Sequence, residues 1–289
     1  MNGAVASNTR NEGNAGMKYR WFLFAGVVAS TLSTSNAQKP PADTTVTFYD
    51  SLYASEIEPD TFTAVAPGPV GFGAGEKLVF NVQYGLITAG EATLEVRNIA
   101  SIGGRPCYRI VSDARTNDFF SKFYQVRDRY ESCMDTTELY TLRYEKHVRE
   151  GKFKRDESVD FDQVAHRAKY KDKVVPIPPR TQDVLSALYY VRTLPLEVGH
   201  SISIANHTDK KNYPLLVKVH GRERVKVDAG EFDCLVVEPI LRGPGVFTQK
   251  GRLTVWLTDD ERRMPVLMKS KVVIGHVAAV LKSYKLSEK

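Results

Sequence analysis

The stretch that decides the fold is residues 77–97, KLVFNVQYGLITAGEATLEVR, in which apolar and polar side chains alternate with a period of two. Such alternation is typical of strands with one face in the core and one face in water. The glycine-containing segment Gly85–Gly90 between the two alternating runs has the length of a hairpin connection. The apolar positions are Phe80, Val82, Tyr84, Ala92, Leu94 and Val96.

The same alternation returns along the rest of the chain, and Asp228-Ala229-Gly230 has the composition of a hairpin turn. Short strands at this spacing indicate an antiparallel sandwich or barrel. Further strands are expected at Tyr108–Ala114, Tyr124–Ser132, Leu139–Arg149, Ser158–Phe161, Ala165–Tyr170, Ser201–Ala205, Tyr213–His220, Arg224–Val227, Phe232–Pro239, Leu253–Thr258, Val266–Val273 and His276–Tyr284.

One segment breaks this rhythm and predicts a helix over Thr181–Thr193. Thr181 is a suitable N-cap, Asp183 falls in the first turn, apolar residues recur at helical spacing, and Pro195 follows. A second, short helix is expected at Asn117–Lys122. The predicted fold is therefore mainly β: a large curved antiparallel sheet, forming a half-open barrel or a sandwich, with one covering helix.

The N-terminal residues predict export. Lys18 and Arg20 precede the apolar run Trp21–Leu32, and Ser35-Asn36-Ala37 supplies small residues for cleavage. The alternative, a membrane anchor, would need roughly 20 apolar residues, and this run has about a dozen. We expect a signal peptide over residues 1–37 with its true start at Met17, no transmembrane segment after cleavage, and a periplasmic or outer-envelope location.

Domain boundaries follow from composition. Residues 38–74 are rich in proline and glycine and predict an N-terminal arm, in which Gly71-Phe72-Gly73-Ala74-Gly75 would be a flexible join. Residues 75–289 would form a single β-rich domain. Without residues 1–37 the chain has 37 basic and 33 acidic residues, and this scattered net charge of +4 does not indicate a nucleic-acid partner.

Metal, disulfide and cofactor chemistry have weak support in the sequence. The odd count of cysteines, Cys107, Cys133 and Cys234, argues against a disulfide framework, and we favour none. No two of the six histidines have the close spacing of a metal site, and His200 and His207 are expected to be solvated. We expect neither a metal nor a cofactor.

Two places combine several polar groups. Asp259 and Asp260, in the connection after a strand, could act as acid and base, but adjacent carboxylates there are more typical of a turn. The second group lies on the predicted helix. Its side chains could line the mouth of a cavity, or they could simply lie at the edge of the core. The second, structural role is favoured. That group is Asp183, Tyr189, Tyr190 and Arg192.

Four motifs in this order resemble an exported bacterial family known as domain of unknown function 3108. They are Gly75-Glu76-Lys77-Leu78 with Ala89-Gly90-Glu91-Ala92, the run Gln182–Arg192, Ala229-Gly230-Glu231-Phe232-Asp233-Cys234, and Trp256-Leu257-Thr258-Asp259-Asp260 continuing to Pro265-Val266. The resemblance covers residues 75–286. It implies a Gram-negative periplasmic or outer-envelope protein, and it transfers no catalytic residue. By analogy of fold, such a sheet is similar to periplasmic lipoprotein carriers.

Two classes of function fit this sequence. The first is a non-enzymatic binding module that holds an apolar or amphipathic envelope ligand such as a lipid. The alternative is a glycan-binding or glycan-active envelope protein that uses Asp259 or Asp260 with Asp183, or else a structural partner of another envelope protein. No catalytic residue is assigned. The candidate ligand-lining or motif residues are Asp183, Tyr189, Tyr190, Arg192, Trp256, Thr258, Asp259 and Asp260.

Overall fold

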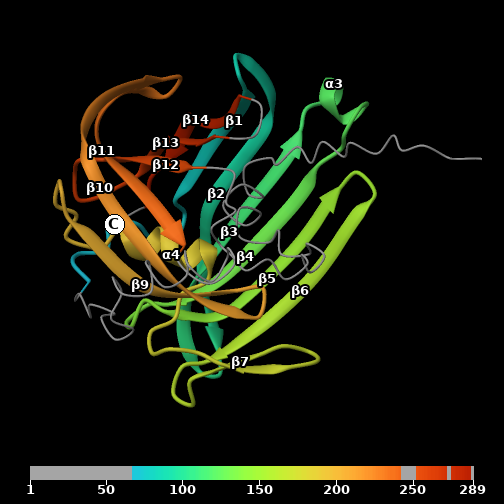
Figure 1. The fold of residues 1–289 in the computed structure, drawn as a ribbon, viewed down its shortest axis with the longest axis vertical. Helices are drawn as coiled ribbons and strands as arrows, with labels where there is room; N and C mark the ends of the chain where they lie inside the picture. The colour runs from blue at the N-terminus through green and yellow to red at the C-terminus, as the bar shows by residue number, and fades with distance from the viewer. Residues whose placement is uncertain (1–66, 242–251, 272–274, 288–289) are drawn as a thin grey trace, which may run out of the picture.

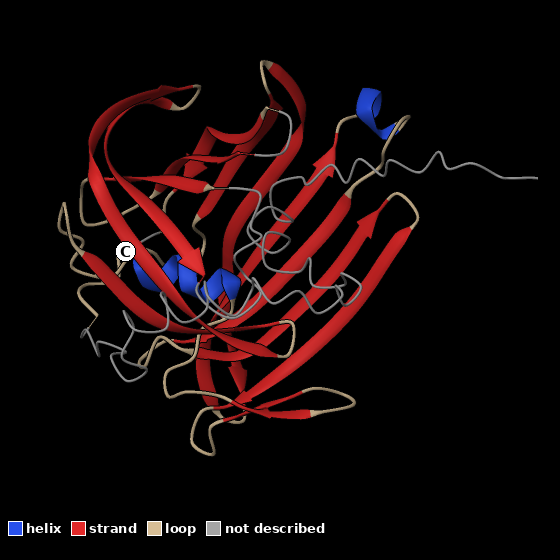
Figure 2. Cartoon of the chain, viewed as in Figure 1, coloured by secondary structure: helices blue, strands red, loops and turns tan. Residues whose placement is uncertain are grey.

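The computed structural model describes residues 67–241, 252–271 and 275–287. The expected signal peptide over residues 1–37 and residues 38–66 of the N-terminal arm lie outside these ranges. The described residues build one fourteen-stranded sheet with two helices, α3 and α4 (Figures 1 and 2). The mainly β prediction is confirmed, and the architecture is a single open, curved sheet rather than a sandwich.

The strands vary from three to seventeen residues in length. Their bounds are β1 Lys77–Tyr84, β2 Ile87–Ile102, β3 Arg105–Thr116, β4 Arg127–Asp135, β5 Thr141–Glu150, β6 Phe153–Asp162, β7 Arg167–Lys169, β8 Val174–Pro176, β9 Ser201–Thr208, β10 Lys211–Val227, β11 Gly230–Leu241, β12 Leu253–Thr258, β13 Pro265–Lys271 and β14 His276–Lys285. The helices are α3 Asp118–Ser121 and α4 Val184–Val191.

The sheet follows the chain order with one exception, which sets its shape. Its order is β8-β7-β6-β5-β4-β3-β2-β1-β14-β13-β12-β11-β10-β9, and all these neighbours pair antiparallel. The first strand thus pairs with the last in the middle of the sheet. The two edges, β8 and β9, are the strands on either side of α4 in sequence, so the chain leaves one edge, forms α4 and returns at the other.

The segment before α4 brings the two edges together. Gln182 forms an isolated parallel bridge with Asn206 of β9, and its N–H donates to the carbonyl of Ala205 at 2.9 Å. The Nδ2 of Asn212 in β10 also donates to the carbonyl of Pro176, the last residue of β8, at 2.8 Å. The curve is thus closed by a connecting segment and side chains, which gives the half-open barrel among the predicted alternatives.

Several predicted elements change their bounds in the structure. The first hairpin turn consists of Gly85 and Leu86 alone, because β2 already begins at Ile87. The predicted strands Tyr213–His220 and Arg224–Val227 are parts of one strand, β10, whose register shifts between Val219 and Gly221. A β-bulge of this kind interrupts the alternation without ending the strand. The short helix expected at Asn117–Lys122 is confirmed as α3.

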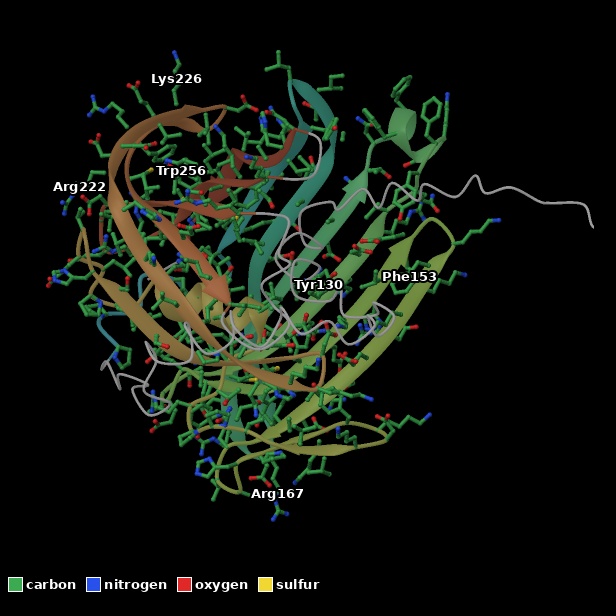
Figure 3. The ribbon with its side chains drawn as sticks, in the orientation of Figure 1. Tyr130, Phe153, Arg167, Arg222, Lys226 and Trp256 are labelled. Atoms are coloured by element: carbon green, nitrogen blue, oxygen red, sulfur yellow. The ribbon has the colours of Figure 1, made fainter. Side chains whose placement is uncertain are left out.

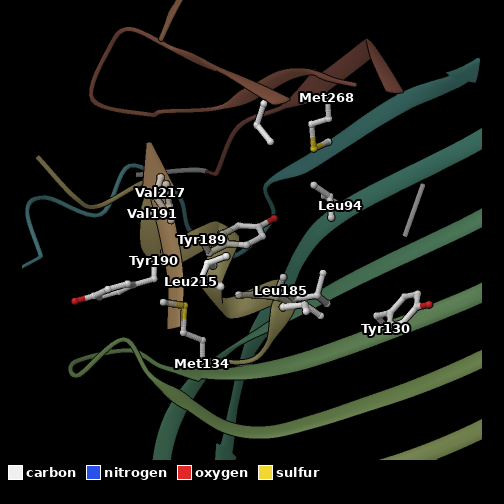
Figure 4. Packing of buried hydrophobic residues seen from close by; sticks show 14 of the residues in the cluster. Leu94, Tyr130, Met134, Leu185, Tyr189, Tyr190, Val191, Leu215, Val217 and Met268 are labelled. Atoms are coloured by element: carbon white, nitrogen blue, oxygen red, sulfur yellow. The ribbon is translucent and has the colours of Figure 1, made fainter. Parts of the chain in front are cut away.

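The predicted helix over Thr181–Thr193 begins later than its sequence signals indicated. α4 starts at Val184, its N-cap is Asp183, and the Thr181 hydroxyl instead donates to the Pro178 carbonyl at 2.6 Å. All residues of α4 except Leu188 are buried. A helix that is apolar all round is typical of a core element, and α4 indeed lies inside the curve of the sheet (Figures 1 and 4).

The convex face of the sheet is polar, and its charges pair across neighbouring strands. Arg129 of β4 lies within 3.1 Å of Asp113 on β3 and within 3.2 Å of Glu131. A small apolar cluster also forms apart from the main core, and it contains Cys107, Cys133, Tyr140 and Leu142. All three cysteines are free and buried. Among the described residues, no helix combines the length and apolar character needed to cross a membrane.

Candidate functional site

The N-terminus of α4 is held by Asp183, whose side chain is completely buried. Its Oδ1 accepts hydrogen bonds from the backbone N–H groups of Leu185 and Ser186, at 2.7 and 3.1 Å. Its Oδ2 accepts from the hydroxyls of Ser132 and Thr141, at 2.6 and 2.8 Å. Burial raises the pKa of Asp183 despite these hydrogen bonds. The carboxyl group therefore fastens α4 to β4 and β5.

The C-terminal end of α4 carries a buried ion pair that the sequence analysis did not single out. The Arg192 guanidinium forms two hydrogen bonds with the Glu76 carboxylate, at 2.7 and 2.8 Å. Both side chains are almost fully shielded from water, with exposed fractions of 0% and 1%. The guanidinium also lies 4.9 Å from the ring centroids of Phe72 and Tyr189. This pair joins α4 to the start of β1.

The glycine-rich segment before β1 is packed against this ion pair, so the predicted flexible join is wrong. Phe72 is buried, and its ring meets that of Tyr189 edge to face at 4.9 Å. A Cβ atom on Gly71 would lie 2.2 Å from the carbonyl oxygen of Glu261. Glycine is required there because the backbone of the next segment approaches too closely for any side chain.

The remaining candidate residues lie at the end of β12, which contains Trp256 and Thr258, and in the turn that follows, which contains Asp259 and Asp260. Asp260 accepts from the Thr258 hydroxyl at 2.6 Å and pairs with Arg262, while Asp259 pairs with Arg222 at 2.6 Å. Trp256, which is labelled in Figure 3, donates its indole N–H to Glu223 at 2.7 Å. These contacts agree with the turn interpretation of the two carboxylates.

A hydrogen bond to one backbone oxygen connects the candidate residues of α4 with those of the turn after β12. The Arg192 Nε donates to the carbonyl of Arg262 at 3.1 Å, and the side chain of Arg262 pairs with Asp260. Asp183, by contrast, lies at the other end of α4. Nine residues of helical rise separate Asp183 from Arg192, which corresponds to about 13 Å along the axis.

An apolar pocket lies where α4 meets the sheet. Its floor comes from successive strands and its cover from α4 and β13, and it has about 20 Å³ of free space. Room of this size holds a water molecule or the tip of a chain, but not a whole acyl chain. The lining residues are Phe80, Ala92, Thr93, Leu94, Ser112, Tyr130, Val184, Leu185, Leu188 and Met268. Figure 4 labels Leu94, Tyr130, Leu185 and Met268 among them.

An ionic cluster adjoins this pocket. Lys146 of β5 lies directly opposite Tyr130 in the ladder, and its ammonium group is 2.6 Å from Asp209 in the β9–β10 turn. Arg155 of β6 contacts both Asp209 and Glu157 at 2.7 Å, and one-third of its side chain is exposed. Apolar and charged groups therefore share one region of the concave face.

His207 is buried beside this cluster, which corrects the expectation that it is solvated; His200 is exposed as expected. The Nδ1 of His207 lies 2.6 Å from Asn212 Oδ1, and its Nε2 lies 2.7 Å from the hydroxyl of Tyr170. Because Asn Oδ1 only accepts, Nδ1 carries the proton and Nε2 accepts from the tyrosine. Burial lowers the pKa of His207, which favours this neutral form.

Asp128, on the inner face of β4, gives a test of the electrostatics of this region. Burial raises the pKa of Asp128, although hydrogen bonds from the Arg149 N–H and with Glu150 oppose the rise. The folded state therefore keeps this proton to higher pH than the unfolded state does. The corresponding stability is fully present below the ordinary aspartate pKa of about 4 and is lost as the pH rises through the folded pKa.

Asp128→Asn is therefore expected to weaken the fall in unfolding free energy between about pH 4 and pH 8, since asparagine mimics the protonated carboxyl and keeps the acceptor for Arg149. Urea unfolding at several pH values measures this slope. The control, Asp156→Asn, should leave the fall between pH 4 and pH 8 nearly unchanged. Hydrogen bonds from His147 and Arg149 lower the pKa of the exposed Asp156, so its contribution to stability changes mainly below about pH 4. An unchanged slope for Asp128→Asn would contradict the prediction.

A model of the family described as "Protein of unknown function (DUF3108)" matches residues 79–282. The chain belongs to the DUF3108 family. The resemblance seen in the sequence motifs is thereby confirmed. A search of the curated proteins finds no match.

The DUF3108 chain is similar to several solved structures at low identity, and one of them, with a TM-score above 0.5, shares its fold. A β-barrel-like protein of the DUF1849 family from Brucella abortus is 8% identical, with a TM-score of 0.53, over 77% of this chain and 100% of that one. A protein from Bacteroides fragilis described as exported, with a YmcC-like fold, is 13% identical over 77% and 100% of the two chains, with a TM-score of 0.28. A protein from Parabacteroides distasonis described as a lipoprotein is 10% identical over 76% and 100%, with a TM-score of 0.30.

The motifs of this DUF3108 chain lie mainly at structural contacts. Glu76 comes from the first motif, Asp183 and Arg192 from the second, and Asp260 from the last, and each makes a contact described above. The role of Glu76 was not evident from the sequence, although its place in the first motif was a signal. Lys146 and Arg155 were not singled out from the sequence either. A charged residue on a strand is usually solvated, and only the folded sheet shows that these two side chains lie on its concave face.

Proposed function

We propose that this protein is a non-enzymatic module of the bacterial envelope that binds an amphipathic ligand on the concave face of its sheet. The observation that carries the proposal is the juxtaposition of the apolar pocket with the ionic cluster. Tyr130 lines the pocket and lies directly opposite Lys146 in the ladder, with Arg155 on the next strand. An apolar tail and an anionic head group would find complementary surfaces there.

The size of the pocket limits how such a ligand binds. With about 20 Å³ of free space, the pocket accepts only the end of an apolar chain. The rest of the chain would lie along the open concave face, and the head group would compete with Glu157 and Asp209 for Arg155, the more exposed of the two cations. The envelope location rests on the export signal predicted from residues 17–37.

The glycan-active alternative has less support. Glycoside hydrolysis needs two carboxyl groups roughly 5 to 10 Å apart. Asp183 lies at one end of α4. Asp260 pairs with Arg262, whose carbonyl contacts Arg192 at the other end of the helix, about 13 Å from Asp183 along the axis. Asp183 is also fully buried and accepts four hydrogen bonds.

Native mass spectrometry of residues 38–289, purified gently from a Gram-negative periplasm, tests the proposal. We expect an adduct with the mass of a phospholipid, fatty acid or lipid-linked sugar. Leu188→Trp should remove most of it, because Leu188 is the partly exposed residue of α4 at the pocket, and a larger ring would block the pocket. Val198→Trp, at an exposed site outside the pocket, is the matched control.

Two results would contradict the proposal. One is a protein without adduct that also fails to bind added phospholipid. The other is an adduct that Leu188→Trp retains at the wild-type level, since the ligand would then bind elsewhere. The melting temperatures of both variants show whether each is folded.

A further inference from the structure

We propose that the loop ends along one side of the sheet form a docking surface for an anionic lipid bilayer. This surface, the apolar rim, consists of the β1–β2 turn at residues 85–87, α3 with its flanks at residues 117–127, and the β5–β6 turn at residues 151–154. Strands β1, β3 and β5 run in the same direction in a fully antiparallel sheet, so these three connections emerge at the same end (Figure 1). The inference is independent of the proposed ligand.

Hydrogen bonds hold the three connections side by side. The side chain of Asn117 donates to the Thr88 carbonyl at 2.8 Å, and its backbone N–H donates to the Ala89 carbonyl at 2.9 Å. At the other end of the α3 region, the Gly151 N–H donates to the Gln125 carbonyl at 2.8 Å. The apolar rim is therefore one continuous edge rather than three separate loops.

Large apolar side chains point into water from this edge. Leu86 is 100% exposed, Ile87 59%, Phe119 62% and Phe123 75%. The rings of Phe119 and Phe123 are 5.5 Å apart, so they form a single aromatic group. Such side chains contribute little to the core, and a cluster of them at loop ends marks an interaction surface. Aromatic and aliphatic side chains of this kind insert into the interface of a bilayer.

The charges beside these apolar groups favour an anionic partner. Lys122, Arg127, Lys152 and Lys154 are exposed and form no ion pair with any described residue. Arg127 also lies opposite Arg115 in the β3–β4 ladder, where like charges repel each other. Basic residues near an anionic membrane are attracted to its surface and strengthen binding. This edge therefore contrasts with the convex face, where cations such as Arg129 are paired with carboxylates.

Vesicle flotation with residues 38–289 tests the proposal. We expect binding to vesicles of phosphatidylethanolamine and phosphatidylglycerol, weaker binding to phosphatidylcholine, and a decrease with salt. The double variant Phe119→Ser, Phe123→Ser should bind at least ~10-fold more weakly, since two exposed rings no longer enter the bilayer. Lys152→Glu with Lys154→Glu should remove most of the preference for phosphatidylglycerol. All four positions are exposed, so these variants should keep the wild-type melting temperature.

Val164→Ser is the matched control, because Val164 is 84% exposed in the β6–β7 connection at the opposite end of β6. The proposal is overturned if the wild type binds neither vesicle, or if the phenylalanine variant floats as well as the wild type. It is equally overturned if the wild type dimerises through these phenylalanines and binds no lipid, since the rim would then join two copies of the chain. If the phenylalanine variant no longer floats with vesicles but keeps the wild-type ligand adduct in native mass spectrometry, the membrane surface and the ligand pocket are two different sites.

Discussion

Replacing Glu76 with alanine is expected to lower the free energy of unfolding by about 3–5 kcal/mol, because the change leaves the buried guanidinium of Arg192 without its counterion. The pair is bidentate, with distances of 2.7 and 2.8 Å, and both side chains are shielded from water. Desolvating an arginine without a carboxylate partner is among the most costly single changes in a protein. Chemical denaturation of the wild type and Glu76→Ala measures the difference.

The double variant Glu76→Ala, Arg192→Met separates the charge effect from lost packing. With both charges removed, no ion remains uncompensated, so the double variant should be more stable than the sum of the single variants predicts. Asp233→Ala is the matched control, since Asp233 forms an equally bidentate pair with Arg224 that is about two-thirds exposed. Water screens the charges of such an exposed pair, so its loss should change the free energy of unfolding little. A loss in Glu76→Ala no larger than in this control would contradict the interpretation.

Asp183→Ala is expected to lower the free energy of unfolding by about 3 kcal/mol. It removes the N-cap of α4, which alone contributes about 1 kcal/mol, and leaves the buried hydroxyls of Ser132 and Thr141 without their acceptor. Asp183→Asn should cost less, because the amide keeps an acceptor for the helix N–H groups and can donate to the two hydroxyls. Urea unfolding of the three proteins measures this order.

Asn117→Ala is the control for the helix cap. Asn117 caps α3 through the Phe120 N–H at 3.0 Å, but it is exposed. Its loss should therefore cost about 1 kcal/mol. If Asp183→Ala were no more destabilising than Asn117→Ala, the contacts between α4 and β4 and β5 would contribute little, and Asp183 would be free for another role.

Sequence reasoning succeeded where a signal is local. The alternation around Phe80 and Leu94 located strands because every second side chain of a strand points to the same face. The short helix expected at Asn117–Lys122 is also local, and in the structure Asn117 caps α3 within its first turn. The same reasoning misplaced the start of α4, since Thr181 and Asp183 are both suitable caps and only contacts with Ser132 and Thr141 select Asp183.

The surroundings of residues at the candidate site were harder to predict from the sequence. His207 was expected to be solvated, but Tyr170 and Asn212 enclose it in the folded chain. The join at Gly71 looked flexible from its composition, yet the approach of Glu261 accounts for its glycine. Tyr170 and Glu261 come from distant parts of the chain, and a local pattern carries no information about them.

The sequence by itself determined that this chain is mainly β, that one helix interrupts the strands, and that its motifs are those of DUF3108. These properties depend on side-chain periodicity and on order along the chain. Only the tertiary structure decided that β1 pairs with β14, that Glu76 meets Arg192 across 116 positions, and that the apolar pocket adjoins the ionic cluster. The physical reason is that periodicity specifies which face of a strand is buried, whereas the neighbours of that face depend on how the whole sheet closes.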